Sequence, residues 1–184
     1  DLITPGSSGK PVPGYEVRLM KEDNSEADMN EIGELEVKGP TSAISYWNKP
    51  EKTEATFIGD WVKTGDKYTK NANGIYKYCG RTDDMMKVSG QYVSPFEIEE
   101  ALQSHKYVLE AAVVGKKDKD ELLKPKAFVV LNVNNNETNL EKELTEHVKK
   151  ILTPFKYPRW YEFVSSLPKT ATGKIQRYKL RIEK

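Results

Sequence analysis

Residues 80–99, GRTDDMMKVSGQYVSPFEIE, mark a change of pattern within this chain of 184 residues. An arginine, two aspartates, a lysine and a glycine stand close together in a run rich in turn-forming residues. The run ends in a helix start, because Ser94 can cap the helix, Pro95 suits its first position and Glu97 stands third. The stretch therefore predicts the end of one structural unit and the first helix of another.

Upstream of this stretch the sequence predicts strands. Apolar and polar residues alternate in residues 15–19 and 33–37, and two further strand-like segments, residues 61–69 and 75–79, flank a turn. Asn73 and Gly74 stand between the last two segments, where Asn-Gly favours a tight hairpin turn. No helical period is found in residues 1–80, so we expect a small antiparallel sheet or partial barrel.

Downstream of the stretch, strand and helix patterns alternate. Residues 85–88 and 91–93 predict a short hairpin, and valine-rich runs at residues 111–115 and 127–133 predict buried strands. Residues 161–164 predict a third strand. The apolar face of the first helix is formed by Ile98, Ala101 and Leu102.

Two more helices are expected near the end of the chain. Residues 138–141 form a capping box after a polar loop at residues 132–139. Four apolar residues follow at helical spacing. They are Leu140, Leu144, Val148 and Ile151. Residues 174–181 predict a short basic helix.

The predicted fold class is α+β, with a small antiparallel β subdomain followed by a three-stranded sheet covered by helices. We expect the boundary within residues 81–84, which gives units of residues 1–83 and 84–184.

Composition excludes several classes of protein. The net charge is +1, from 29 basic and 28 acidic residues, which provides no basic face for a nucleic acid. No apolar run approaches the ~20 residues that span a bilayer. Cys79 is the only cysteine, so no intrachain disulfide forms and a cytoplasmic location is expected. The chain starts at Asp1 without a methionine, and we interpret it as part of a longer polypeptide.

Simple site types are rejected. His105 and His147 are too few and too far apart in sequence to predict a metal site, and we expect both to be exposed helix residues. Thr172, Gly173 and Lys174 resemble the end of a phosphate-binding loop, but an earlier glycine is missing and Ile175 replaces the required Ser or Thr.

Lys174 is the strongest candidate for a catalytic residue. It stands in PKTATGKIQR, residues 168–177, at the expected start of the basic helix. A lysine is unfavourable at the positive end of a helix dipole unless an anion binds there. Between a carboxylate and a phosphate, Lys174 would neutralise the charge that develops during attack.

Other candidates have both a functional and a structural interpretation. Asp66 could accept hydrogen bonds from two ribose hydroxyls or only satisfy turn amides. Arg81 could bind a nucleotide or be a charge at a strand end. Asp83 could absorb a hinge rotation or lie in a solvated turn. Lys87 and Gly90 could line a ligand path or simply form the hairpin turn.

Three ordered segments together resemble the acyl-adenylate-forming ligase superfamily. They are KTGD at residues 63–66, residues 80–99, and residues 168–177. The wording of residues 78–99, 122–131 and 156–160 is most similar to the benzoate-CoA ligases. The resemblance implies an acid–thiol ligase that activates a carboxylic acid with ATP, releases AMP and transfers the acyl group to coenzyme A.

The resemblance also implies site residues. Asp66 and Arg81 would bind the nucleotide, and Lys174 would contact the carboxylate and α-phosphate during adenylation. Asp83 would be the hinge about which residues 84–184 rotate. After this rotation, the hairpin that carries Lys87 would replace Lys174 in the site. Lys87 is implied to be a second catalytic residue.

For coenzyme A, the resemblance implies that Gly90 lines the pantetheine path and that Lys156 and Arg159 contact phosphates. Mg²⁺ would neutralise the nucleotide phosphates, and no metal ligand is predicted in this chain. A membrane or nucleic-acid partner is not expected.

The family's phosphate loop and acid pocket lie outside these residues, so the chain alone is predicted to be inactive and to need the missing N-terminal domain. Two alternatives stay open. One is part of a medium-chain acyl-CoA synthetase, and the other is a non-catalytic module that docks a nucleotide, coenzyme A or a carrier protein.

Overall fold

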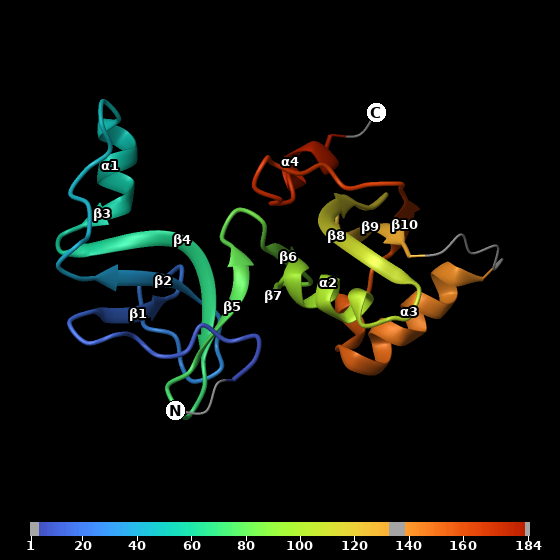
Figure 1. Cartoon of the computed structure of the whole chain (residues 1–184), viewed down its shortest axis with the longest axis horizontal. Helices are drawn as coiled ribbons and strands as arrows, with labels where there is room; N and C mark the ends of the chain where they lie inside the picture. Colours follow the sequence, from blue (N-terminus) through green and yellow to red (C-terminus); the bar gives the residue numbers. More distant parts are fainter. Residues whose placement is uncertain (1–3, 133–138, 183–184) are drawn as a thin grey trace. The chain divides into compact units, whose positions relative to one another are not determined.

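The computed structural model describes residues 4–132 and 139–182. The chain forms two compact units, Asp1–Asp83 and Asp84–Lys184. Figure 1 shows sheets in both units and the longer helices in the second. This arrangement of antiparallel sheets with helices confirms the predicted α+β class.

The first unit is built on a five-stranded antiparallel sheet in the order β1-β2-β4-β3, with β5 also paired to β4. The strands are β1 (Glu16–Met20), β2 (Gly33–Lys38), β3 (Phe57–Ile58), β4 (Trp61–Lys70) and β5 (Tyr76–Arg81). The predicted turn between β4 and β5 is confirmed. Oδ1 of Asn71 accepts hydrogen bonds from the amides of Asn73 and Ile75, and Gly74 has a φ of +71°.

A helix in the first unit was missed by the sequence pattern. Only strands were predicted in residues 1–80, but α1 spans Pro50–Thr56. None of its residues is buried, so it has no apolar face that could produce a helical period. Pro50 at the first position and the hydrogen bond from the Thr53 hydroxyl to the Lys49 carbonyl stabilise its first turn.

The second unit combines a hairpin with a three-stranded sheet. Strands β6 (Met86–Val88) and β7 (Gln91–Val93) form the hairpin. The sheet has the order β10-β9-β8, where β8 (Val108–Lys117) is antiparallel to β9 (Leu123–Leu131) and β10 (Trp160–Phe163) is parallel to it. The helices are α2 (Pro95–Gln103), α3 (Leu140–Ile151), the 3-10 turn η1 (Pro154–Lys156) and α4 (Arg177–Leu180).

Both faces of the three-stranded sheet are covered. Side chains of β8 and β9 alternate between two apolar clusters, one beneath α2 and α3 and the other beneath the C-terminal segment. Figure 1 shows α2 and α3 on one side of this sheet and α4 on the other. Burial on both sides explains the continuous valine-rich runs in the sequence.

The predicted helix starts and faces are mostly confirmed. The Ser94 hydroxyl accepts a hydrogen bond from the Glu97 amide at 3.2 Å, which caps α2. Ile98 and Leu102 are fully buried. In α3 the expected face is buried except at Ile151, which is 51% exposed. That part of the prediction is wrong, because Leu152 packs against the core instead.

Parts of three predictions fall on residues 133–138, outside the described residues. These are Thr138 of the capping box, Val133 at the end of the second valine-rich run, and most of the polar loop. The observed N-cap of α3 is Asn139, whose side chain forms no capping hydrogen bond.

Candidate functional site

Asp66 and Arg81 lie side by side on adjacent strands of the first unit. They are register partners in β4 and β5, and Nη1 of Arg81 donates to Oδ1 of Asp66 at 2.9 Å. The same Nη1 also donates to the Thr64 carbonyl at 3.1 Å. The Asp66 side chain is 30% exposed and that of Arg81 is 50% exposed, so both can reach a ligand. The pair presents a carboxylate acceptor next to a planar cation.

Gly65 makes the approach of the Arg81 guanidinium possible. Its φ is +73°, and a Cβ there would lie 2.8 Å from Nη2 of Arg81. The Thr82 amide donates to the Gly65 carbonyl at 2.8 Å, which holds this turn of the backbone. Glycine therefore serves both the conformation and the close contact.

Lys87 and Gly90 lie on the β6–β7 hairpin of the second unit. Ser89 and Gly90 have positive φ values of +51° and +81°. A two-residue type I′ hairpin turn requires positive φ at both of these positions. Lys87 is exposed, and its ammonium lies 5.5 Å from the ring centroid of Tyr92 on the opposite strand. The backbone of the turn is open, because a Cβ on Gly90 would meet no atom within 4 Å.

Lys174 lies on a small hairpin, not at the start of a helix. Lys169 and Ile175 form an isolated antiparallel bridge, and the Thr170 amide donates to the Lys174 carbonyl at 2.8 Å. Gly173 has a φ of +83° in the turn between them. The helix α4 begins only at Arg177 and is four residues long. The predicted helix over residues 174–181 is therefore wrong at its start, and the helix dipole does not act on Lys174.

The hairpin has its own local reasons to form. The Thr170 hydroxyl accepts a hydrogen bond from the Lys174 amide at 3.0 Å, and the Gly173 amide donates to the Thr170 carbonyl. These contacts lock the backbone at the base of the Lys174 side chain, which is exposed. The ammonium is thus presented to solvent from an ordered turn.

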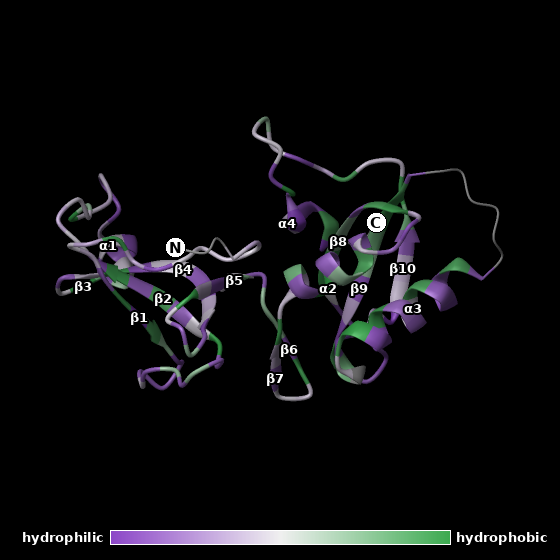
Figure 2. Ribbon diagram, turned by 60° about the horizontal axis from the view of Figure 1, so that its bottom comes forward, coloured by the Kyte–Doolittle hydropathy of each residue, from purple (hydrophilic) through white to green (hydrophobic). Residues whose placement is uncertain are grey.

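The two lysine-bearing hairpins lie on different sides of the second unit. Figure 2 shows the β6–β7 hairpin and the loop that precedes α4 extending away from the sheet in opposite directions. Lys87 belongs to the first segment and Lys174 to the second.

Lys156 and Arg159 already have contacts within the second unit. Nζ of Lys156 lies 2.6 Å from Oε2 of Glu97 and its side chain is 19% exposed. The guanidinium of Arg159 lies 3.6 Å from the ring centroid of Tyr157, and partial burial lowers its pKa. A coenzyme A phosphate would have to compete with the Glu97 carboxylate for the Lys156 ammonium. This competition argues against the predicted contact between Lys156 and coenzyme A.

Asp83 and Asp84 form the junction between the two units, and each pairs with arginines of a different unit. Oδ1 of Asp83 lies 3.7 Å from Nε of Arg81, in the first unit, and the Asp83 side chain is 78% exposed. Asp84 is 16% exposed and is bound by Arg177 at 3.5 Å and by Arg181, both in the second unit. The peptide between Asp83 and Asp84 therefore connects two residues that are each fastened to their own unit.

The ionic network around Glu99 was not found from the sequence. Glu99 is 3% exposed, and Nη2 and Nε of Arg177 donate to its two oxygens at 2.6 and 3.1 Å. The amide of Val113 also donates to it, at 2.8 Å. Burial raises the pKa of the Glu99 carboxyl, and the Arg177 and Val113 hydrogen bonds oppose that rise. The sequence does contain one signal of this buried ion pair. Glu99 directly follows Ile98 and lies near the apolar face of its helix.

The two histidines differ from the prediction. His105 is 8% exposed and follows α2, so the expectation of an exposed helix residue is wrong. Its ring lies 4.9 Å from that of His147, and its Nε2 lies 3.2 Å from Oε1 of Glu143. Desolvation lowers the pKa of His147, and repulsion from His105 adds to this.

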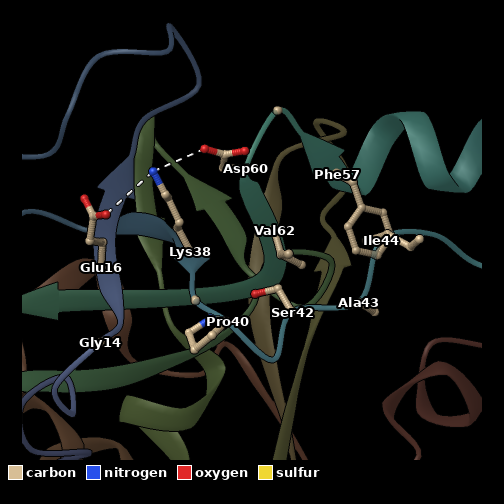
Figure 3. Close-up of a pocket in the computed structure, with 12 residues that line it drawn as sticks. Gly14, Glu16, Lys38, Pro40, Ser42, Ala43, Ile44, Phe57, Asp60 and Val62 are labelled. Carbon is tan, nitrogen blue, oxygen red and sulfur yellow. Dashed lines mark ion pairs between the residues drawn. The ribbon is translucent and has the colours of Figure 1, made fainter.

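A pocket of about 450 Å³ lies in the first unit, away from Asp66 and Arg81. Figure 3 shows Lys38 on one side of it, 3.2 Å from Asp60 and 3.7 Å from Glu16. Ile44 and Phe57 line another side. Because two carboxylates already neutralise its lysine, the pocket has no strong preference for an anion.

Neither a metal cluster nor a membrane helix is found among residues 4–132 and 139–182. No group of three His, Cys, Asp or Glu side chains there could hold a metal ion. Within the same residues, no helix has the length and apolar character needed to cross a membrane.

A family model and several known proteins match this chain. Residues 97–174 match the family described as AMP-binding enzyme C-terminal domain. This match and the similar proteins described below confirm the resemblance to the acyl-adenylate-forming ligases.

Similar proteins point to the aryl-CoA ligases in particular. The chain is 60% identical over 178 residues to the benzoate–CoA ligase of Thauera aromatica. The aligned residues cover 96% of this chain and 34% of that protein. Two solved structures are also similar. The anthranilate CoA ligase AuaEII in complex with anthranoyl-AMP has a TM-score of 0.91 and 48% identity, covering 97% of this chain and 35% of that one. A benzoate CoA ligase from Burkholderia xenovorans LB400 has a TM-score of 0.89 and 51% identity, covering 98% and 36%. The chain thus spans about a third of the length of these relatives.

Proposed function

We propose that this chain is the C-terminal part of an ATP-dependent, AMP-forming carboxylic acid–CoA ligase that acts on benzoate or a related aryl acid. The observation that carries the proposal is the 60% identity to a benzoate–CoA ligase over nearly the whole chain. Residues 1–83 would complete the large adenylating domain, and residues 84–184 would be the mobile C-terminal domain.

In the first half-reaction, a carboxylate oxygen attacks the α-phosphorus of ATP, and the bond to the pyrophosphate oxygen breaks. Asp66 would accept hydrogen bonds from the ribose hydroxyls, and Arg81 would add a cation beside it. Their 2.9 Å contact and partial exposure support this, because the pair is ordered yet accessible. Lys174 would stabilise the negative charge shared between the carboxylate and the α-phosphate.

In the second half-reaction, the thiol of coenzyme A attacks the acyl carbonyl, and AMP leaves. Lys174 has no part in this step, and the β6–β7 hairpin would replace it. Gly90 would let the pantetheine arm pass close to the backbone, while Lys87 would act at the transfer site. The placement of the two hairpins on different sides of the second unit supports such an exchange. Arg159 and, more weakly, Lys156 would contact the phosphates of coenzyme A.

Asp83 would be the hinge. Its exposed side chain and the buried anchor of the next residue, Asp84, support a rotation that begins between them. ATP and coenzyme A are the co-substrates. Among the described residues no cluster could hold Mg²⁺, so the ion would be bound by the nucleotide phosphates. We place the enzyme in the cytoplasm, on the basis of a single cysteine, Cys79.

The test measures the two half-reactions separately in the full-length polypeptide. Lys174→Ala should reduce acid-dependent pyrophosphate release and largely spare thioester formation from a preformed acyl-adenylate. Lys87→Ala is the matched control, since it should spare pyrophosphate release. A panel of benzoate, substituted benzoates and medium-chain acids would identify the substrate and test the medium-chain alternative.

Equal loss of both steps in Lys174→Ala would contradict the exchange of faces. A full-length protein that releases no pyrophosphate with any acid, yet binds a nucleotide or coenzyme A, would support the docking-module alternative instead. The 184 residues alone should release none, because the phosphate loop and acid pocket of the family are not in them.

A further inference from the structure

The hairpin that carries Lys174 is fastened to the rest of the second unit at several points. Leu167 before it is 5% exposed, and Ile175 at its end packs on the same apolar cluster of β8 and β9. Lys169 pairs with Glu110 on β8 at 2.5 Å. Both groups of that ion pair are about one-third exposed, so water screens it.

The buried anchor of this hairpin is Arg177. It follows Lys174 by three residues, and its side chain is 18% exposed. Two of its nitrogens bind the two oxygens of Glu99, and a third, Nη1, lies 3.5 Å from Oδ2 of Asp84. A planar guanidinium can make these contacts at once, whereas a lysine ammonium cannot reproduce their geometry.

Glu99 connects the guanidinium to the core. It lies on α2, and its Oε1 also accepts the amide hydrogen of Val113. Val113 is on β8, an edge strand of the three-stranded sheet, so Glu99 satisfies a backbone donor there. Arg177 is therefore held by a glutamate of α2 that is itself hydrogen-bonded to the backbone of β8.

Asp84 connects the guanidinium to the junction. It is the first residue of the second unit, directly after the proposed hinge Asp83. Arg177 thus joins, through one side chain, the segment of the catalytic lysine and the residue at which rotation of the unit would begin.

We propose that Arg177 is a positioning residue for adenylation, with Glu99 and Asp84 as its two anchors. It makes the Lys174 hairpin rotate as one body with the second unit, so that rotation at the junction places the ammonium at the reacting carboxylate. This inference rests on the proposed function, and it concerns the placement of Lys174, not its chemistry.

The test uses Arg177→Gln and Arg177→Lys in the full-length polypeptide. Arg177→Gln should lower kcat for acid-dependent pyrophosphate release on the order of 10²-fold, the effect of a misplacement near 1 Å. Thioester formation from a preformed acyl-adenylate should stay within about threefold, because it does not use Lys174. Arg177→Lys should fall between Arg177→Gln and the parent protein. The matched control is Lys179→Gln, an exposed lysine of the same segment, which should leave both steps unchanged.

A second variant covers the case in which Arg177→Gln does not fold, since it leaves two carboxylates without their cation. Glu99→Gln combined with Arg177→Gln replaces the buried ion pair with two amides and still lacks the link to Asp84. It should show the same selective loss of pyrophosphate release.

Two results would overturn the inference. One is that an Arg177 variant with the same melting temperature as the parent loses the rates of both half-reactions equally. The other is that the Arg177 variants lose neither rate. If Lys174→Ala impairs adenylation and the Arg177 variants do not, the inference fails while the proposed function stands. If the parent protein activates no acid, the proposed function itself fails.

Discussion

Ionisation of Tyr161 should destabilise the second unit at alkaline pH. Tyr161 lies on β10 and packs against the cluster beneath α2 and α3. Its hydroxyl accepts a hydrogen bond from the Thr145 hydroxyl on α3 at 3.2 Å. Burial raises the pKa of Tyr161 to about 12, although the Thr145 hydrogen bond opposes the rise.

The sign and size of the effect follow from linkage. Because the pKa is higher in the folded chain than the ~10 of an unfolded chain, this contribution is complete below pH ~10 and is lost between pH ~10 and ~12. Two pKa units correspond to about 2.7 kcal/mol, of which about 1.4 kcal/mol should be lost by pH ~11.

The assay is urea unfolding of the 184-residue chain at pH ~8 and pH ~11, compared with Tyr161→Phe. The parent should lose about 1.4 kcal/mol more than Tyr161→Phe over this interval, because the variant has no phenol to ionise there. Other alkaline effects are common to both proteins and cancel. If Tyr161→Phe loses as much stability as the parent, Tyr161 does not ionise against burial and the reasoning is refuted.

Three further predictions concern other parts of the chain. Leu144→Ala, at a fully buried position of α3, should lower the free energy of unfolding by about 3 kcal/mol in urea titrations, and an effect below about 1 kcal/mol would contradict the described core. His147 has a lowered pKa, so stability should fall as the pH drops below ~6.5, and His147→Gln should flatten this dependence in thermal melts from pH ~7 to ~5. Gly65→Ala and Gly59→Ala both place alanine at positive φ and should each cost about 1 kcal/mol. Only the first should also weaken nucleotide binding in the full-length protein, because only its Cβ would displace Arg81; equal binding in both variants would count against a role for that arginine.

Most elements could be predicted from the sequence because their signals are local. The sequences of β1 and β2 alternate, an Asn-Gly turn separates β4 from β5, and the valine-rich runs of β8 and β9 are buried on both faces. Capping by Ser94 needs only three neighbouring residues. The helix α1 was not predicted, because a helix with no buried residues has no apolar period in its sequence.

The candidate site could be predicted in part. The order of motifs predicts the resemblance to the ligase family, and the sequence alone selects Asp66 and Arg81, which the structure shows in contact. The predicted helix start at Lys174 is wrong, because the Thr170 hydroxyl and a glycine at positive φ continue the hairpin to Ile175, and the helix begins only at Arg177.

The sequence by itself determined the resemblance to the ligase family and the order of most strands and helices, and it selected Asp66 and Arg81 as candidates for nucleotide binding, because short-range periodicity and motif order do not depend on how distant segments meet. Only the tertiary structure decided that Arg177 binds Glu99 across 78 positions of the chain and also reaches Asp84. The physical reason is that a buried charge must find its partner in space, and that partner is set by the packing of α2 and β8 against the C-terminal segment rather than by any spacing along the sequence.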